Sequence, residues 1–485
     1  MEDKYIVTID LGTRNLSLAV GKAGDNGKID ICYYNEFPSE GISHGKVLNP
    51  TRLGGALKTA VSSAENFLGI KINEVMVNCQ KYDIRQVEKR VVREIDEQLC
   101  ISKEQLEMLE DLAAEQVMEE LENGEEIISL VVQNFNTDDE FSVNENDVVG
   151  MMSSHLEGIY KIFIGKSASS KYIDAAFSSI GINLVRKVFV PDYVGKCCLS
   201  RSEIDGGVAL FDLGAGASSV SVFYGGVLRH YGAIPFGSRN ITADIANLCE
   251  ISDSLAENIK MGYGGCMPDK LESLGEKTLR ITDSESSDRT EFTAKYLSEI
   301  ITAREKEIID ALLYEIQLSG YADKLKNGVV LVGGGANMLN ICNLIKLISG
   351  YNARVAAPGR TIFNSSISSF FNMSAAMQAA LLLRLSNENV SCTEKAQPQV
   401  ESVRQNVDEE EVISNADDVR SNLLFSEEET QRSSREEKRE KKEKKEKKER
   451  KEKKQKEETR KSWGGIFGNL SSAVFGEDSD PENEI

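Results

Sequence analysis

Features that mark metal clusters, disulfides and membrane-spanning helices are scarce in this 485-residue sequence. Its three histidines, His44, His155 and His230, are isolated, and its nine cysteines form neither a CxxC pair nor a Cys/His spacing that suits zinc. We therefore expect reduced thiols, as in a cytosolic protein. No run of about eighteen apolar residues is present, and Met1–Asp10 has no basic or long apolar region, so we expect neither a bilayer-spanning helix nor a secretion signal.

The formal net charge of −21 argues against nucleic acid as a partner, because phosphate neutralisation needs a basic surface. The charge is uneven along the chain, however. Residues 432–461 contain 17 basic and nine acidic side chains, a net charge of about +8, so the remainder is more acidic than the total suggests. Lysine and glutamate three or four positions apart pair along a helix, and this Lys/Glu-rich segment is consistent with a solvated helical spacer.

Composition divides the chain into a folded body and a tail. Residues 1–386 alternate strand-like apolar runs with helical periodicity, which is typical of an α/β protein. Residues 387–431 are rich in Ser, Glu, Gln, Asn and Asp with few aromatics, the composition of a disordered linker. The Lys/Glu-rich segment follows, and residues 462–476 then change the pattern again.

Residues 462–476 predict an amphipathic helix. Apolar residues recur along one helical face, and we expect membrane contact through Trp463, Ile466, Phe467, Leu470, Val474 and Phe475. Three glycines weaken this helix in water, so it would order only at an interface. One such helix would bind lipid loosely, and stable attachment would need many tails on one polymer. A short adhesive peptide for a protein partner is the alternative interpretation.

Two glycine-containing hairpins of the same design lie about two hundred residues apart. Tyr5–Gly21 reads as two strands around the turn Asp10-Leu11-Gly12-Thr13-Arg14-Asn15. Gly207–Phe223 repeats this design around the turn Asp212-Leu213-Gly214-Ala215-Gly216-Ala217-Ser218. Either hairpin alone is also what an ordinary tight turn would give. Their recurrence favours a duplicated domain in which each copy presents one phosphate-binding turn to a shared cleft.

A third glycine cluster follows the strand-like run Gly328–Val332. The residues Gly333-Gly334-Gly335-Ala336-Asn337 lead into a helix predicted over Met338–Leu347. A strand, glycines and a helix let backbone lie flat against a nucleotide and point helix amides toward it. No GK[ST] follows the glycines and the pattern is not GxGxxG, so neither a Walker A loop nor a dinucleotide fold is indicated.

These three elements, in this order, resemble the phosphate 1, phosphate 2 and adenosine motifs of the actin, Hsp70 and sugar-kinase superfamily. Four segments narrow the resemblance to the FtsA family, which ties FtsZ filaments to the membrane: Tyr224–His230, Ile234–Gly237, Thr242–Ala246 and Ala256–Lys260. The resemblance implies an α/β, actin-like (ribonuclease H-like) fold of duplicated domains around a nucleotide cleft. The halves would be residues 1–200 and 201–386, with an inserted subdomain at about 83–165 used in contacts between subunits. Hinges would lie near 190–199 and 374–376.

The resemblance also implies a site for ATP and Mg²⁺. The phosphates would be held by Asp10, Gly12, Thr13, Arg14, Asn15, Asp212, Gly214, Ala215, Gly216, Ala217 and Ser218. The nucleoside would be held by Gly237, Glu257, Lys260, Gly333, Gly334, Gly335, Ala336 and Asn337. Asp10 and Asp212 would hold Mg²⁺ through water.

The second turn departs from the superfamily form Asp-x-Gly-Gly-Gly-Thr-x-Asp. Ala215, Ala217 and Ser219 stand where that form has glycine, threonine and an acid. Phosphoryl transfer depends on positioning and electrostatics, so ATP hydrolysis would be slow at most. No catalytic residue can be named from the sequence.

The function implied is a self-assembling adaptor. ATP-bound subunits would polymerise, bind the C-terminal peptide of FtsZ through about residues 238–325, and attach by the terminal helix to the cytoplasmic face of the cell membrane at the division septum. Two alternatives on the same fold stay open. A small-molecule kinase would need a substrate pocket with a catalytic Asp, which the sequence does not single out. A pilus-assembly actin homologue has no evident need of a lipid-binding tail.

Overall fold

The computed structural model describes residues 5–24, 27–96, 100–271, 275–282, 289–386 and 392–394. These belong to one compact unit, Met1–Pro398, and a second unit covers Gln399–Ile485. The Lys/Glu-rich segment and the predicted amphipathic helix, with Trp463, Ile466, Phe467, Leu470, Val474 and Phe475, lie outside the described residues. Within the predicted linker, Cys392–Glu394 forms strand β20, which pairs with β6 (Ile70–Ile72).

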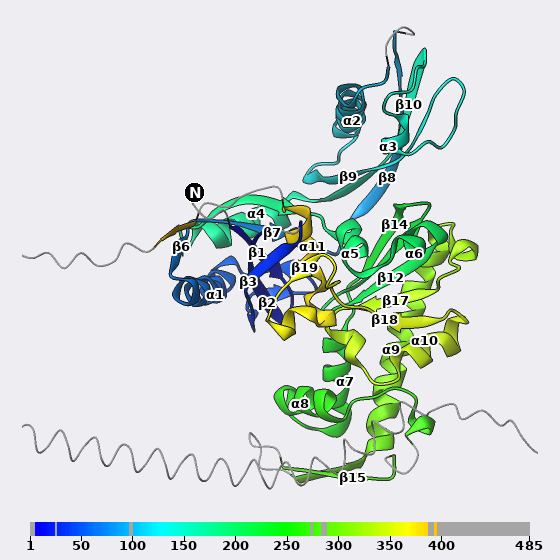
Figure 1. The fold of residues 1–485 in the computed structure, drawn as a ribbon. Coiled ribbons are helices and arrows are strands. Elements are labelled where there is room, and N and C mark those ends of the chain that lie inside the picture. The colour runs from blue at the N-terminus through cyan, green and yellow to red at the C-terminus, as the bar shows by residue number, and fades with distance from the viewer. Residues whose placement is uncertain are drawn as a thin grey trace, which may run out of the picture. The chain divides into compact units, whose positions relative to one another are not determined.

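Two mixed sheets of matching design carry the compact unit (Figure 1). In each sheet, three consecutive strands pair antiparallel through hairpins. A fourth strand then pairs in parallel with the first strand of that set. The first sheet has the order β11-β7-β1-β2-β3-β19, formed by Asn183–Val188, Glu74–Asn78, Ile6–Leu11, Asn15–Ala23, Ile29–Pro38 and Phe363–Asn364. The second has the order β14-β13-β12-β17-β18, formed by Val227–Ile234, Ser218–Tyr224, Val208–Leu213, Val329–Val332 and Ala353–Val355. The two hairpins that the sequence predicts as a repeat are thus parts of two sheets that repeat as a whole.

The first strands of the two sheets are alike in sequence and pairing. Strands β1 and β12 are buried along their whole length, as expected of apolar strands covered on both faces. In the hairpin register Asp10 lies opposite Ser17, and Asp212 lies opposite Ser219. Each aspartate therefore stands at the same position relative to the turn that follows it.

A third, antiparallel sheet has the order β8-β10-β9, with strands Arg85–Glu94, His155–Lys166 and Glu125–Asn136. Together with α2 (Lys103–Met118) and α3 (Glu145–Val148) it encloses its own core around Phe135 and Tyr160. Gln133 Nε2 donates a hydrogen bond to the Leu228 carbonyl at 3.0 Å, and the Gln86 amide contacts the His230 ring at 2.7 Å. This sheet therefore packs on β14 of the second half.

Helices cover the two main sheets, and two apolar cores lie beneath them. Helices α5 and α11 pack against each other, and they lie in or next to the segments predicted as hinges. Among the described residues no helix is both long and apolar enough to cross a bilayer. The helices are α1 (Pro50–Leu68), α4 (Ser167–Ser178), α5 (Pro191–Cys198), α6 (Arg201–Gly206), α7 (Ser238–Cys249), α8 (Asp253–Tyr263), α9 (Ala294–Leu318), α10 (Ile341–Ser349) and α11 (Ala376–Arg384).

Short elements join these parts. They are β4 (Ile42–Ser43), β5 (Lys46–Val47), β15 (Thr278–Thr282), β16 (Arg289–Thr293), η1 (Pro268–Lys270), η3 (Ala322–Lys324), η4 (Gly334–Asn337), η5 (Ser368–Phe371) and η6 (Met373–Ala375). The helix predicted from Met338 begins later, at Ile341, because η4 is a single 3-10 turn and Asn340 takes a left-handed backbone (φ 64°) before the helix starts.

Candidate functional site

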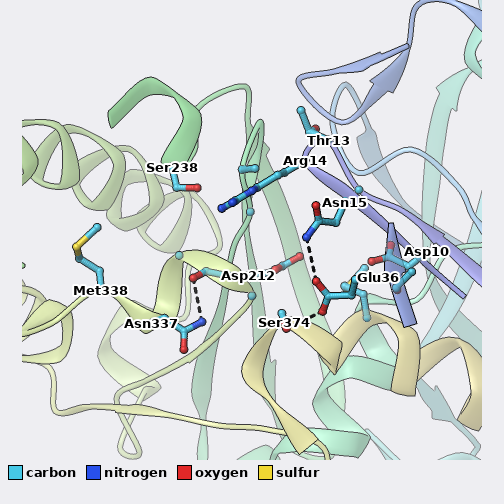
Figure 2. Close-up of a pocket in the computed structure, with 18 of the residues that line it drawn as sticks. Asp10, Thr13, Arg14, Asn15, Glu36, Asp212, Ser238, Asn337, Met338 and Ser374 are labelled. Carbon is cyan, nitrogen blue, oxygen red and sulfur yellow. Dashed lines mark hydrogen bonds between the residues drawn. The ribbon is translucent and has the colours of Figure 1, made fainter. Parts of the chain in front are cut away.

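A cavity of about 510 Å³ is lined by residues of both main sheets, within the size range of small-molecule sites (Figure 2). Many of the predicted site residues line it: Asp10, Gly12, Thr13, Arg14, Asn15, Asp212, Gly214, Ala215, Lys260, Gly333, Gly334, Gly335 and Asn337. All three predicted glycine-containing segments therefore meet at one place.

The two turns touch each other directly. A Cβ added at Gly216 would lie 2.6 Å from both Cγ2 and Oγ1 of Thr13, so only glycine allows the first turn to approach so closely. Thr13 Oγ1 accepts a hydrogen bond from the Gly45 amide at 2.9 Å. The neighbouring His44 contacts the carbonyls of Gly216 and Pro235 through Nδ1, at 3.2 and 2.8 Å. The loop between β4 and β5 thus holds the two turns together.

Gly12 and Gly214 are required for the same reason in both turns. An added Cβ would lie 2.3 Å from the Asn15 carbonyl oxygen in the first turn and 2.4 Å from the Ala217 carbonyl oxygen in the second. Any side chain would force the turn to open. Tight turns of this kind leave backbone amides available to an anion.

The third glycine cluster packs against the second turn. Gly333 has φ 86°, and an added Cβ there would lie 2.5 Å from Asp212 Oδ1. At Gly335 an added Cβ would lie 2.9 Å from Leu213 Cβ. These glycines let the chain after β17 cross close to Asp212 and form one wall of the cavity.

Helix α8 contributes a polar cluster at the same cavity. Lys260, which is buried, donates from Nζ to the Ser238 carbonyl at 2.9 Å, to Thr242 Oγ1 at 2.8 Å and to Glu257 Oε2 at 2.7 Å. Burial raises the pKa of Glu257, but its bonds from Lys260 and Thr242 outweigh this and leave the pKa below its usual value. Burial lowers the pKa of Lys260, and Glu257 offsets only part of that.

Arg14 of the first turn reaches this cluster from the opposite wall. Its guanidinium forms an ion pair with Glu257 and also contacts the sulfur of Met261 at 3.1 Å. Arg14 lines both the main cavity and a neighbouring one of about 330 Å³ bordered by α7 and α8, whose lining includes Glu257. An ion pair between residues 14 and 257 therefore joins the two halves across the site.

The two predicted metal ligands are already engaged. Asn78 Nδ2 donates to Asp10 Oδ1 at 2.6 Å, and Lys81 Nζ donates to Asp212 Oδ2 at 3.1 Å. Burial raises the pKa of Asp10 while the Lys81 charge opposes that rise, so the ammonium acts on both carboxylates. Among the described residues no group of three or more His, Cys, Asp and Glu side chains is arranged to hold a metal. With Lys81 in this position, the donor set does not fit a Mg²⁺ ion shared by the two aspartates.

Several predicted residues do not line the main cavity: Gly216, Ala217, Ser218, Gly237, Glu257 and Ala336. Gly216 and Gly237 instead serve close packing, since a Cβ added at Gly237 would lie 2.4 Å from the Gly214 carbonyl oxygen. Ser218 Oγ is buried and has no hydrogen-bond partner among the described residues. Glu257 lines the neighbouring cavity.

Other residues line the cavity and were not predicted, chiefly Ser17, Glu36, Lys81, Ser238, Ser374 and Met377. Glu36 accepts hydrogen bonds from Asn15 at 3.0 Å, Tyr34 at 2.7 Å and Ser374 at 3.1 Å, two of which are drawn in Figure 2. A signal for Lys81 does exist in the sequence. It follows the buried strand β7, which is parallel to β1, and carboxyl ends of neighbouring parallel strands meet at one sheet edge.

The structure has two sheets of the same design, and each carries a glycine-containing turn at the shared cavity, next to the third glycine cluster. This arrangement defines an actin-like fold, and the predicted fold is confirmed. The PilM protein complex described as "PilM-PilN type IV pilus biogenesis complex" has a similar structure, with a TM-score of 0.53 and 14% identity over 79% of this chain and 98% of that one. At this identity the likeness shows the fold alone.

Sequence comparison finds similarity to one family of proteins. Residues 209–376 match the family described as "Cell division protein FtsA". The FtsA of Neisseria meningitidis serogroup B is 29% identical over 360 residues, covering 74% of this chain and 84% of the relative. The FtsA of Borreliella burgdorferi is 28% identical over 359 residues, covering 74% and 86%. The chain thus resembles the FtsA family of cell-division proteins, as its motifs predict.

Proposed function

We propose that this FtsA-like protein binds ATP in the 510 Å³ cavity and acts as a self-assembling adaptor that tethers FtsZ filaments to the inner face of the cytoplasmic membrane at the division site. One observation carries the nucleotide part of the proposal. Two turns with the same steric need for glycine, at Gly12 and Gly214, touch each other and share a cavity with a third glycine bend. Similarity to the FtsA family supports the role in division.

Different walls of the cavity would bind the phosphates and the nucleoside. The amides of the turns around Gly12 and Gly214 would bind the phosphates, because both turns expose backbone to the cavity. Gly333 to Gly335 would lie against the nucleoside, and Lys260 lines the same space from α8. Arg14, paired with Glu257, would close the site between the halves.

The same geometry favours slow hydrolysis at most. Ala217 offers no hydroxyl, and Ser219 lies opposite Asp212 where the superfamily form has an acid. Glu36, the remaining carboxylate on the first sheet's wall, already accepts three hydrogen bonds. Fewer groups are then available to orient an attacking water, so we expect nucleotide to act mainly as a ligand for conformation and assembly.

Membrane attachment in this proposal rests on the sequence pattern of residues 462–476. In a helix, the apolar side chains from Trp463 to Val474 would fall on one face, and interfacial binding scales with that apolar area. FtsZ would bind through its C-terminal peptide to about residues 238–325. Polymerisation would gather many weak tails on one surface, which raises their effective concentration.

Liposome sedimentation tests the adaptor. The full chain and a version ending at Arg460 are each mixed with anionic vesicles and FtsZ, with and without ATP. We expect the full chain to carry FtsZ into the vesicle pellet and the shortened chain to leave it in solution. A full-length variant with Trp463 and Phe467 changed to Ser keeps the length and charge of the tail and should behave like the shortened chain.

Three outcomes would count against this assignment. Equal sedimentation of the full and shortened chains would remove the membrane claim. Phosphorylation of a sugar or another small molecule by the full chain would favour the kinase alternative instead. A pilus-assembly role would be favoured if the chain bound neither FtsZ nor vesicles while still binding nucleotide.

A further inference from the structure

A lysine lies where two carboxylates of the cavity come together. Lys81 Nζ is 3.1 Å from Asp212 Oδ2, and only 19% of the lysine side chain and 10% of the aspartate side chain are exposed. The side chain is therefore a fixed ammonium ion inside the site.

Both halves of the molecule hold Lys81 in place. Its carbonyl accepts a hydrogen bond from the Tyr231 hydroxyl of β14 at 2.7 Å. Three residues earlier, Asn78 accepts from the Leu11 amide at 2.7 Å and donates to Asp10 at 2.6 Å. The segment after β7 is thus tied to the first turn on one side and to the second sheet on the other.

The charges that face Lys81 leave a clear deficit of cations. Asp10, Asp212 and Glu36 all line the cavity, and the charges of Asp212 and Glu36 both act on Asp10. The other cations on the described walls, Arg14 and Lys260, are both engaged with Glu257. A nucleoside diphosphate would add further negative charge beside Asp10 and Asp212, and Lys81 is the cation placed to meet it.

Mg²⁺ fits poorly in the same place. It requires near-octahedral oxygen ligands and keeps several waters, and an ammonium bound to one carboxylate both repels the ion and occupies its ligand. To enter, Mg²⁺ would have to displace Lys81 from Asp212.

We infer that Lys81 supplies the positive charge between Asp10, Asp212 and the nucleotide phosphates, so that adenine nucleotide binds with little dependence on Mg²⁺. The inference rests on the proposed nucleotide site and assigns a phosphate-binding residue within it. Lys81 would donate to the phosphates from the same position in which it now donates to Asp212.

The test uses the full chain and a fluorescent ADP analogue, with affinity measured in excess MgCl₂ and in EDTA. For the natural sequence we expect the two affinities to agree within about threefold. Lys81→Met should weaken binding in EDTA by about 10- to 100-fold, as expected for loss of a charged hydrogen-bond donor, and Mg²⁺ should restore part of it. Lys81→Arg should keep binding in EDTA.

A second measurement needs no nucleotide. Calorimetric titration with MgCl₂ alone should show no binding to the natural sequence, whereas Lys81→Met removes the ammonium from beside the two carboxylates and should bind Mg²⁺. Lys89→Met is the matched control, because Lys89 has a similar exposure, 20%, and lies on β8 of the third sheet, where it pairs with Glu120 away from the cavity. Thermal unfolding confirms that each variant is folded.

The outcomes separate this inference from the proposed function. If the natural sequence loses about 100-fold or more of its ADP affinity in EDTA, and Lys81→Met behaves the same, the inference is wrong while the nucleotide site stands. If ADP binds in neither buffer, the proposed nucleotide site itself is wrong.

Discussion

The turn after β1 and the turn after β12 share a backbone but differ in chemistry. A Cβ added at Gly12 or Gly214 would lie 2.3 or 2.4 Å from the carbonyl oxygen of the residue three positions later, so both turns exclude a side chain at the glycine. The first turn then carries Thr13, Arg14 and Asn15, whereas the second carries only small residues up to Ala217. The duplicated fold thus fixes the backbone of both turns and leaves their side chains free to diverge.

The difference assigns separate tasks to the two turns. Arg14 forms an ion pair with Glu257 across the site, and Asn15 donates a hydrogen bond to Glu36. The first turn therefore fixes side chains on two walls of the cavity. The second turn lets Thr13 approach Gly216 closely and provides backbone alone. Positive charge beside Asp212 comes instead from Lys81, which lies outside both turns.

The largest expected effect tests whether the two turns are equivalent in their backbone. Gly12→Ala and Gly214→Ala should each lower the free energy of unfolding by about 3 kcal/mol, because each adds a Cβ against a carbonyl oxygen. Urea denaturation measures this. Gly55→Ala in α1 is the control, since its Cβ meets no atom within 4 Å, and it should be neutral or stabilising by up to about 1 kcal/mol. A cost at only one of the two turns would break the comparison.

The second prediction is that Glu305, in the second half of the chain, makes the free energy of unfolding depend on pH. Burial raises the pKa of Glu305 in α9 to about 7, with Lys260 opposing the rise. The folded state therefore holds this proton more tightly than the unfolded chain. Its contribution is fully present below about pH 4.5 and is lost as pH rises through about 7, at a cost of about 3 kcal/mol.

The variant Glu305→Gln should remove that loss. We expect it to be more stable than the natural sequence at pH 8 by about 3 kcal/mol and similar to it near pH 4.5. In the first half, Glu65 is also buried but accepts bonds from the Ile72 amide at 2.9 Å and from Lys71 at 2.8 Å. Glu65→Gln should therefore be destabilising, and a gain in stability from it would contradict this contrast.

The smallest expected effect on stability concerns Arg14. Arg14→Ala should change the free energy of unfolding by less than about 1 kcal/mol, because the arginine side chain in the ion pair with Glu257 is 44% exposed and solvent screens the pair. Nucleotide release should nevertheless become about threefold faster, since the pair joins the two halves. Stopped-flow displacement of a fluorescent ADP analogue measures the rate.

The control for Arg14 is Arg354→Ala. Arg354 pairs with Glu203 at side-chain exposures of 45% and 17%, close to the 44% and 20% of Arg14 and Glu257, but it lies on β18 and does not line the cavity. Equal release rates in the two variants would show that the Arg14 pair has no role in holding nucleotide.

The sequence predicted the turns and the third glycine cluster because their chemistry is local. An aspartate, a glycine and flanking apolar strands specify each hairpin within about ten residues. The residues it missed depend on register instead. Lys81 reaches Asp212 only because β7 pairs in parallel with β1, and Glu36 reaches Asn15 only through the pairing of β2 with β3.

Helix boundaries show the same limit. Helix α2 begins at Lys103 because the Gln105 side chain accepts a hydrogen bond from the Ser102 amide at 2.9 Å, a capping contact that periodicity does not specify. At α10 the backbone angle of Asn340 ends the glycine-rich turn before the helix starts, a feature that periodicity alone does not contain. Membrane and FtsZ binding stay predictions from the tail sequence and the family.

Calorimetric titration of the full chain with ADP tests most directly the claim that both turns grip one nucleotide. We predict one bound nucleotide per chain, with affinity weakened at least about tenfold by Gly12→Ala and equally by Gly214→Ala, while Gly55→Ala binds like the natural sequence. Absence of ADP binding, or unchanged binding in either turn variant that remains folded, would contradict it.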